Sequence, residues 1–559
     1  MNDVFEYIVD GTSGLAPGDV SGSTLVTGVC SAGTAGKAYL LGKSSNLNSL
    51  LGYGALVDAL RDLFATGGQD AVVVAVPCAG IAGGYITNIT HAGDGAEATV
   101  SGVAAGSADV VIKVDSAGVL GVATVKVSVD GGTTYGSSQQ VGADGILALT
   151  TYGANVVFAG DLALDDTYSF AVRTPIGPVK HVGTGPNISV AGTVTMGADI
   201  ILLITSSGGR NEGTYQLSLD GDNYGTEKTI PSDGVIKVGS TGVTITFPDS
   251  DAVVGDTYTF RLLAPVPTVS NVMSAIEQPL EVYDVENVYV VGPTDSVDWA
   301  SFATYADELF NKHRPTYFLC ESRMPYSNES IDDWTTAMIA ERQGFSYRFL
   351  TVCAAYGEIS ASDGYTQQRN AGGLLQGRIL SIPVMRSVGR VRDAAVSQLS
   401  LPEGYNESHI TLLAEAGYTV AKFYAGLDGT YWEDAMTMAD DTSDFLYLRV
   451  VRTVFKALRL ARKAALKSMY DEVGDPIATD GASGLTYLAT NIEGAVNTMA
   501  AASPQELAEC IVTFPDGQDI VNNGIAAELE LIGIPVIKSI KLYARYVYAG
   551  SSADSRLEV

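Results

Sequence analysis

The sequence is poor in the residues on which metal sites and nucleophilic catalysis depend. It has four histidines in 559 residues, and no two of them show the His-x-x-x-His spacing that places two ligands on one helix face. A Gly-x-Ser-x-Gly nucleophile motif with a plausible partner is also missing. The cysteines are odd in number and lack the short spacings of a zinc site, so we expect buried thiols at Cys30, Cys78, Cys320, Cys353 and Cys510. We therefore expect no catalytic residue, no bound metal and no cofactor, and we expect that the protein is not an enzyme.

Basic residues and long apolar runs are scarce as well. The chain has 33 Lys and Arg against 63 Asp and Glu, which gives a formal net charge of −30. Such a charge repels phosphate backbones and anionic lipid surfaces, so we expect neither nucleic acid nor a membrane as a partner. The apolar run Ala71–Val76 is far too short to span a bilayer. The N-terminus carries Asp3, Glu6 and Asp10 where a secretory signal has basic and apolar residues, so we expect synthesis in the cytoplasm.

Two short motifs imitate functional sites. Gly42-Lys43-Ser44 matches the end of a phosphate-binding loop, but Lys37 stands where that loop needs its first glycine, so we interpret the segment as a turn. Ser128–Tyr135 matches the Asp-box hairpin of sialidase propellers, and a shorter copy occurs at Ser218–Tyr224. Because two such hairpins cannot build a propeller, we predict structural turns at both places.

Glycine and β-forming residues are abundant, and they fall in a tandem repeat. Ser128-Val-Asp-Gly131 recurs as Ser218-Leu-Asp-Gly221, and Asp166-Thr-Tyr-Ser-Phe170 recurs as Asp256-Thr-Tyr-Thr-Phe260. Each copy alternates apolar and polar residues, which is typical of half-buried strands. We expect two tandem immunoglobulin-like β-sandwich domains at residues 90–178 and 180–267. His91 and His181 flank the two copies at equivalent positions, so we expect a repeated linker role for them.

The flanks of the repeat alternate helical and strand patterns. Before it, a helix is predicted at Leu56–Phe64 and a strand at Ala71–Val76; after it come a strand at Val288–Gly292, a helix at Trp299–Asn311, a strand at Thr316–Cys320 and a helix from Ile331. We therefore expect a multidomain protein of mixed α+β and α/β class. Its discontinuous α/β core comprises residues 21–89 and 268–533, with an N-terminal arm at 1–20 and a C-terminal arm strand at 534–559.

The segment Ile534–Tyr548 is a long strand candidate near the end of the sequence. Alternation places the following residues on one face: Ile540, Leu542, Ala544, Tyr546 and Tyr548. A terminal strand outside its own sheet offers free backbone groups that can pair with a neighbouring chain. The alternative is an ordinary last strand in the sheet of the same chain.

A basic stripe is predicted on the helix that spans Arg449–Lys467. At about 100° per residue, six of its basic residues fall within about 80° of arc: Arg449, Arg452, Lys456, Arg459, Lys463 and Lys467. A basic stripe on an acidic protein favours an acidic partner, either an inner tube protein or a neighbouring subunit. A solvated helix face is the alternative, and DNA is disfavoured.

Several motifs in order resemble one family. The first are Gly36-Lys-Ala-Tyr-Leu-Leu-Gly42, Leu51-Gly-Tyr-Gly54, Gly67-Gly68 and Val72-Val-Val-Ala-Val76, which are similar to the start of contractile-tail sheath proteins. The last are Phe423-Tyr-Ala-Gly426, Asp440-Asp-Thr-Ser-Asp444, the basic helix and Asp519-Ile-Val-Asn-Asn-Gly524, which resemble the end of that family. The resemblance covers about 350 residues and leaves out the repeat.

The resemblance implies a structural subunit of a virion tail. Family members stack as rings of six around a tail tube, are connected by arm strands, and contract to drive the tube through the host envelope. The implied partners are further copies of the chain, the tube protein, and baseplate and tail terminator proteins. Two other classes are alternatives: an adhesin whose β-domains bind glycans, and a hydrolase with appended β-domains, which the missing nucleophile motif disfavours.

Overall fold

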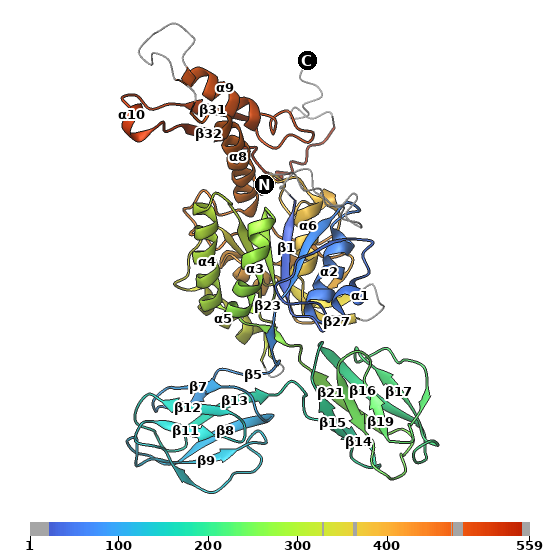
Figure 1. Cartoon of the computed structure of the whole chain (residues 1–559). Helices are drawn as coiled ribbons and strands as arrows, with labels where there is room; N and C mark the ends of the chain where they lie inside the picture. Colours follow the sequence, from blue (N-terminus) through green and yellow to red (C-terminus); the bar gives the residue numbers. More distant parts are fainter. Residues whose placement is uncertain (1–21, 327–328, 361–365, 471, 473–483, 550–559) are drawn as a thin grey trace, which may run out of the picture. The chain divides into compact units, whose positions relative to one another are not determined.

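The computed structural model of the chain describes residues 22–326, 329–360, 366–470, 472 and 484–549 (Figure 1). The predicted N-terminal arm at 1–20 and residues 550–559 of the predicted C-terminal arm lie outside this range. Contacts divide the chain into two units, with the boundary between Lys463 and Ala464. Each unit is described by itself below.

A mixed sheet of six strands forms the centre of the first unit in the described residues. Its order is β2-β3-β1-β23-β24-β25, and every neighbouring pair is parallel except β2 with β3. The strands are β1 (Thr24–Gly28), β2 (Tyr39–Gly42), β3 (Val72–Pro77), β23 (Asn287–Thr294), β24 (Tyr317–Ser322) and β25 (Leu350–Cys353). The central strands are buried on both faces, as parallel strands covered by helices are.

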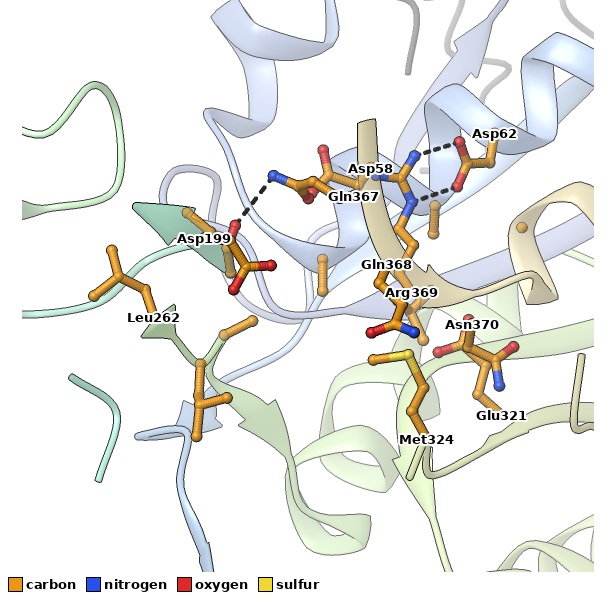
Figure 2. Close-up of a pocket in the computed structure, with 18 of the residues that line it drawn as sticks. Asp58, Asp62, Asp199, Leu262, Glu321, Met324, Gln367, Gln368, Arg369 and Asn370 are labelled. Carbon is orange, nitrogen blue, oxygen red and sulfur yellow. Dashed lines mark hydrogen bonds and ion pairs between the residues drawn. The ribbon is translucent and has the colours of Figure 1, made fainter. Parts of the chain in front are cut away.

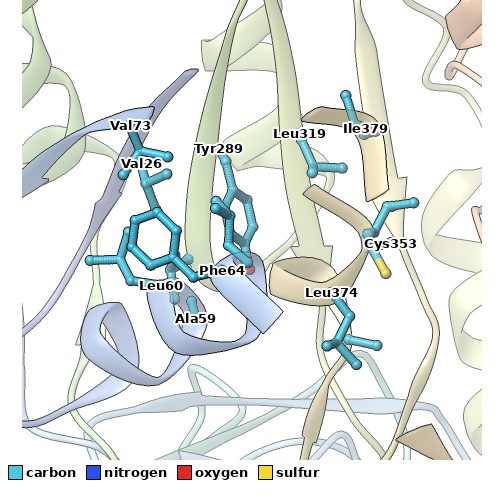
Figure 3. Close-up of a cluster of buried hydrophobic side chains, with 14 of the residues drawn as sticks. Val26, Ala59, Leu60, Phe64, Val73, Tyr289, Leu319, Cys353, Leu374 and Ile379 are labelled. Atoms are coloured by element: carbon cyan, nitrogen blue, oxygen red, sulfur yellow. The ribbon is translucent and has the colours of Figure 1, made fainter. Parts of the chain in front are cut away.

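Helices cover both faces of this sheet (Figure 1). Successive residues of a strand point to opposite faces, so Val26 packs in one hydrophobic cluster and Leu25 in the other. The cluster with Val26 includes residues of α1 (Leu47–Leu51), α2 (Ala55–Thr66) and α6 (Gly372–Ser381), and Figure 3 shows part of it. The other cluster includes residues of α3 (Val269–Val282), α4 (Ser296–Asn311), α5 (Ile331–Arg342) and α7 (Glu407–Glu415). Burial on both faces fixes the sheet between two helical layers.

The helices and strands predicted for the core between Leu56 and Val76 and from Val288 to Ile331 are all present, with their ends shifted by a few residues at most. The helix predicted at Leu56–Phe64 is α2, and the strand predicted at Ala71–Val76 is β3. Asp295 caps α4 in a capping box, which explains why that helix begins three residues before the predicted Trp299. The mixed α/β class is thereby confirmed for the core.

Helices α2 and α6 pack closely because α6 presents glycines to α2. A Cβ atom at Gly377 would overlap the Leu63 carbonyl oxygen and the Thr66 hydroxyl.

We predict that Gly377→Ala lowers the free energy of unfolding by about 1–3 kcal/mol through overpacking, measured by thermal unfolding with circular dichroism. Gly494→Ala in helix α9 (Gly484–Val496) is the matched control, because among the described residues its added Cβ would meet no atom within 4 Å outside its immediate neighbours and its own helix backbone. It should stabilise its helix by about 0.5–1 kcal/mol. Equal effects of the two changes would contradict the close packing.

The repeat leaves and rejoins the core through two short antiparallel strands, β4 (Gly80–Ile81) and β22 (Val266–Pro267). The first insert then forms the sheet β10-β9-β8-β13-β5, with β6 also on β13, and the sheet β11-β12-β7. Its strands are β5 (Tyr85–Ile86), β6 (Thr90–Ala92), β7 (Ala98–Gly102), β8 (Ala108–Ser116), β9 (Thr124–Ser128), β10 (Gln139–Gln140), β11 (Ile146–Leu149), β12 (Ala154–Phe158) and β13 (Thr167–Arg173). The two sheets enclose a hydrophobic cluster of their own.

The second insert repeats this pairing. Its sheets are β14-β21-β16-β17-β18 and β15-β20-β19, around another separate cluster. Its strands are β14 (Lys180–Val182), β15 (Ser189–Gly192), β16 (Ala198–Ser206), β17 (Thr214–Ser218), β18 (Lys228–Thr229), β19 (Val235–Lys237), β20 (Val243–Thr246) and β21 (Thr257–Leu262). Ala108 pairs with Val172 in the first insert as Ala198 pairs with Leu262 in the second, so the sequence repeat is also a repeat of register.

The two Asp-box-like segments form structural turns, as predicted. The Asp130 carboxylate accepts hydrogen bonds from the backbone N–H and the hydroxyl of Thr134, at 2.8 and 2.6 Å. The Asp220 carboxylate accepts equivalent bonds from Asn223. Hydrogen bonds from Thr134 and Ser128 lower the pKa of Asp130 to about 2. Each carboxylate therefore closes its own turn.

The remaining elements complete the core and the second unit. Irregular chain with short strands and one 3-10 helix follows β25: β26 (Tyr356–Ser360), β27 (Thr366–Asn370), η1 (Val391–Asp393), β28 (Leu399–Ser400), β29 (Ala421–Lys422) and β30 (Tyr431–Trp432). Helix α8 (Leu448–Ala465) crosses the boundary between the units and continues as the 3-10 helix η2 (Leu466–Ser468). The second unit holds α9, β31 (Glu509–Thr513), α10 (Ile520–Asn523) and β32 (Glu528–Ile532), and β31 pairs with β32.

Candidate assembly surfaces

The first basic residues of α8 form ion pairs inside the core. The Arg452 guanidinium contacts the Glu286 carboxylate through Nε–Oε1 at 2.5 Å and Nη2–Oε2 at 3.3 Å. Both side chains are almost fully buried, at 3% and 2% exposure. Glu286 directly precedes β23, so the ion pair fastens α8 to the central sheet.

Two further arginines of the predicted stripe have partners within the chain. Arg449 forms an ion pair with Asp434 at 3.4 Å. The Arg459 guanidinium lies 3.4 Å from the Asp284 carboxylate and donates to the Val285 carbonyl oxygen at 2.7 Å. The arginines therefore hold the helix in place.

The three lysines of the stripe differ from one another in their exposure to solvent. Lys456 is half-buried and has an interaction partner within the chain, whereas Lys463 and Lys467 are exposed, as is Arg462 between them. The six residues do not form one continuous solvent-facing surface. Docking of the stripe on a tube or a neighbouring subunit stays a prediction, and among the six residues Lys463 and Lys467 are the ones exposed to such a partner.

The predicted arm residues are exposed and belong to no strand of their own chain. Residues 533–548, which follow β32, form neither helix nor strand. Leu542 is 89% exposed and Tyr546 is 82% exposed, and Ile540, Ala544 and Tyr548 are exposed as well. The ordinary last strand in the chain's own sheet is therefore not what the structure shows for residues 533–548, and pairing with another chain stays a prediction.

A pocket of about 190 Å³ lies between the second insert and the core, and sequence reasoning missed it (Figure 2). Its charged and amide side chains come from α2, β16, β21, β24 and β27, which are far apart in sequence. Arg369 forms a two-bond ion pair with Asp62, at 2.9 and 2.7 Å, and the Gln367 amide donates to the Gly197 carbonyl oxygen at 3.2 Å. The ion pair joins β27 to α2 within the core, and the Gln367 hydrogen bond joins the second insert to the core.

A buried carboxyl group in the wall of this pocket also has hydrogen-bond partners within the chain. Glu321 accepts hydrogen bonds from the Tyr289 hydroxyl and from the Gly292 N–H. Burial raises the pKa of Glu321 to about 7, although these two hydrogen bonds act in the opposite direction. Within the described ranges, no group of three or more His, Cys, Asp or Glu could hold a metal ion. These contacts indicate a structural role for the polar residues of the pocket.

The repeated histidines are not linkers, so that expectation was wrong. His91 lies in β6, stacks on Tyr168 with 4.3 Å between ring centroids, and its Nε2 lies 3.2 Å from Asp166 Oδ2. His181 in β14 makes the same contacts with Tyr258 and Asp256. The two clusters fasten β6 to β13 in the first insert and β14 to β21 in the second. The sequence signal was the shared spacing from each histidine to the Asp-x-Tyr that follows it.

We predict that both base and acid weaken the first insert through this cluster. Burial lowers the pKa of His91, but hydrogen bonds and charges from Glu97 and Asp166 outweigh it, so the pKa lies above the usual 6.5. The stabilisation is therefore complete below pH 6.5 and is lost as the pH rises through the raised pKa. Burial raises the pKa of Asp166, yet His91 and backbone N–H groups outweigh this and hold it below 3.8, so its contribution is lost as the pH falls through that lowered value.

The measurement is amide hydrogen exchange by mass spectrometry, corrected for the intrinsic rate. The readout is the Gly95 amide, which donates to Asp166 at 2.7 Å. At pH 6, His91→Gln should lower the free energy of exchange protection at Gly95 by about 1 kcal/mol. In this variant, the protection of Gly95 should no longer fall as the pH rises. His181→Gln is the matched control and should leave Gly95 unchanged. An unaltered pH profile in His91→Gln would contradict the assignment.

These features define a class of chain: a discontinuous α/β core that carries two antiparallel β inserts and an exposed apolar segment after its last strand. The chain belongs to the DUF2586 family. The model of the DUF2586 N-terminal domain matches residues 1–436, and that of the DUF2586 C-terminal domain matches residues 444–551. A search of curated proteins finds no match. Among the described residues, no helix has the length and apolar character needed to cross a membrane.

Solved structures that are similar to this chain include sheath proteins. The sheath tail protein from Desulfitobacterium hafniense has 11% identity and a TM-score of 0.41, and the match covers 96% of this chain and 100% of that one. The sheath tail protein from Listeria innocua has 11% identity and a TM-score of 0.40, with 93% and 98% covered. The contracted PVC sheath of an extracellular contractile injection system has 14% identity and a TM-score of 0.37, with 52% and 76% covered.

Proposed function

We propose that this chain is a structural subunit of a contractile tail sheath and polymerises with copies of itself. The observation that carries the proposal is the segment after β32, whose apolar side chains from Ile540 to Tyr548 are exposed in the single chain. Burial of such surface favours association by about 25 cal/mol per Å². The backbone groups of this segment pair with no strand among the described residues, and they can complete a ladder with another chain. A segment of this kind suits a connecting arm.

The order of the sheath-like motifs supports the same proposal. Gly36–Gly42 leads into β2, and Val72–Val76 forms β3 beside it in the central sheet. The acidic segment Asp440–Asp444 precedes α8, and Asp519–Gly524 includes α10 just before β32. The motifs thus occur at the start of the core and at the end of the chain, on either side of the two inserts.

The finer parts of the proposal follow from the sequence resemblance. Subunits form rings of six that stack around a tail tube, and contraction drives the tube through the host envelope. A baseplate and a terminator protein bound the sheath, and the assembled protein belongs to the virion tail. The proposed domains also rest on the tandem repeat and the local sequence patterns: an arm at 1–20, a core at 21–89 and 268–533, immunoglobulin-like sandwiches at 90–178 and 180–267, and an arm at 534–559. We propose no catalytic role.

Electron microscopy of the purified chain tests this function. Negative-stain images are recorded with and without a tube protein encoded beside it. We expect hollow, cross-striated sleeves, and their formation should rise steeply with protein concentration, as for a polymer. Dispersed monomers under every condition, with the tube protein present, would contradict the proposal.

A further inference from the structure

Two groups of oppositely charged residues lie at the two ends of α8, a helix whose course is drawn in Figure 1. The acidic loop comprises Asp440, Asp441 and Asp444, which precede the helix and are exposed. The basic end comprises Arg462 and Lys463 in its last turn, which are exposed as well. In the part of the chain that the structure describes, none of these five side chains forms an ion pair. Each group is therefore available to a partner.

One copy of the chain cannot bring these two groups together. Helix α8 has 18 residues, which corresponds to about 27 Å at a rise of about 1.5 Å per residue. Exposed charges are screened beyond about 8 Å at physiological ionic strength. Because the helix is rigid, its ends stay apart, and charge complementarity between them can be satisfied only by two molecules.

The rest of the basic stripe has a different use. Arg449, Arg452 and Arg459 pair with Asp434, Glu286 and Asp284 of the same chain. The last turn of α8 therefore retains the exposed positive charge of this helix. The acidic loop lies where the two family domains meet, after residue 436 and at residue 444.

We propose that the basic end of α8 in one subunit contacts the acidic loop of a second copy of this chain. The inference rests on the proposed function, because it needs a polymer, and it names the partner of the basic stripe. Two different surfaces meet in this contact, so it is heterologous, and such contacts propagate into rings or open helices. Each copy carries a net charge of −30, so approaching copies repel unless a basic surface meets an acidic one. The contact therefore also selects the register between subunits.

A charge-swap experiment tests the contact. The full-length chain is assembled at low salt, with tube protein if sleeves need it, and the lowest concentration that gives polymer is measured by sedimentation. Arg462→Glu with Lys463→Glu should raise this concentration at least about tenfold, and so should Asp440→Lys with Asp441→Lys. The variant that combines all four changes should return to within about threefold of the original chain, because opposite charges face each other again. Lys43→Glu with Lys312→Glu, two exposed lysines elsewhere in the first unit, is the matched control and should change little.

Each outcome decides the proposal. If either double variant polymerises like the original chain, the contact does not exist. If both double variants fail and the fourfold variant is not rescued, the basic end docks on something else, such as the tube, whose charge was left unchanged. If the original chain never polymerises, the proposed function itself fails, and this inference fails with it. Tryptophan fluorescence verifies that each variant keeps a folded core.

A crosslinking measurement gives an independent answer. One copy carries Asp441→Cys and the other carries Lys463→Cys, and the two are mixed during assembly with a flexible bis-maleimide crosslinker. A crosslinked heterodimer is expected; a linker is used because an ion pair between long side chains leaves the Cα atoms beyond the limit of about 7 Å that a direct disulfide needs. Each single variant alone should give far less dimer. The same low yield from the mixture as from the single variants would overturn the contact.

Discussion

Replacing Arg452 with methionine should lower the free energy of unfolding of the core by about 3–5 kcal/mol. The change keeps most of the aliphatic stem but leaves the Glu286 carboxylate, 2% exposed, without its opposite charge. Breaking a buried ion pair on one side is costly because the remaining charge cannot be solvated. Since domains are stable by only about 5–15 kcal/mol, a loss of this size removes much of the margin.

Urea unfolding followed by tryptophan fluorescence measures this loss in the core alone. All three tryptophans, Trp299, Trp334 and Trp432, are buried in the core, and the inserts have none. Arg452→Met combined with Glu286→Gln should recover much of the stability, because no buried charge is left. Arg462→Met, on the exposed face of the same helix, is the matched control and should stay within about 0.5 kcal/mol. An Arg452→Met chain as stable as this control would show that the ion pair is not formed.

This ion pair also changes how docking of the basic stripe can be tested. Charge reversal at Arg452 or Arg459 would place a carboxylate beside Glu286 or Asp284 and destabilise the fold. Loss of assembly in such a variant would say nothing about a partner. The exposed residues Arg462, Lys463 and Lys467 are the positions at which a docking test is free of this effect.

Local pattern predicted much of the core, and the reason is physical. Apolar spacing of 3.6 or 2 residues determines whether a segment can bury one face, so α2, β3, β23 and α4 were predicted close to their observed limits. The repeat was predicted for a related reason. Equal spacing of Asp166 and Asp256 within their copies requires equal strand pairing, and the registers of the two inserts agree.

Contacts between distant segments could not be predicted from such patterns. Periodicity showed that Arg449, Arg452 and Arg459 share a helix face, but it could not show that the face meets Glu286, Asp284 and Asp434. The pocket was missed because Asp62 and Arg369 come from segments 307 residues apart. The histidines were placed in linkers because their partners stand 75 residues later.

The arm segment shows a different limit of prediction from the sequence. Alternation at Ile540, Leu542 and Ala544 predicts a strand, yet the single chain has none there. A strand is completed by hydrogen bonds to a neighbour, and residues 533–548 pair with no strand in the part of the chain that the structure describes. The alternation therefore indicates that this segment can form a strand when a second chain provides the strand that pairs with it.

Deletion of residues 534–559 should abolish polymers and leave a folded, soluble chain. The deleted part that the structure describes lies in no helix or strand, and side chains such as Leu542 and Tyr546 are 89% and 82% exposed, so its loss removes little buried surface from the monomer. The urea midpoint by tryptophan fluorescence should therefore stay unchanged. In the polymer, the loss of several ladder hydrogen bonds at about 1 kcal/mol each should raise the assembly concentration at least about a hundredfold.

Single substitutions locate this effect within the arm. Leu542→Asp and Tyr546→Asp place charges on the face that a neighbouring sheet would cover, and each should raise the assembly concentration about tenfold or more. Val182→Asp, at a side chain 58% exposed in the second insert, is the matched control and should assemble normally. The readouts are sedimentation and negative-stain imaging with tube protein. Sleeves of normal length from the truncated chain would refute the arm, whereas normal sleeves from the point variants alone would place the pairing elsewhere within residues 534–559.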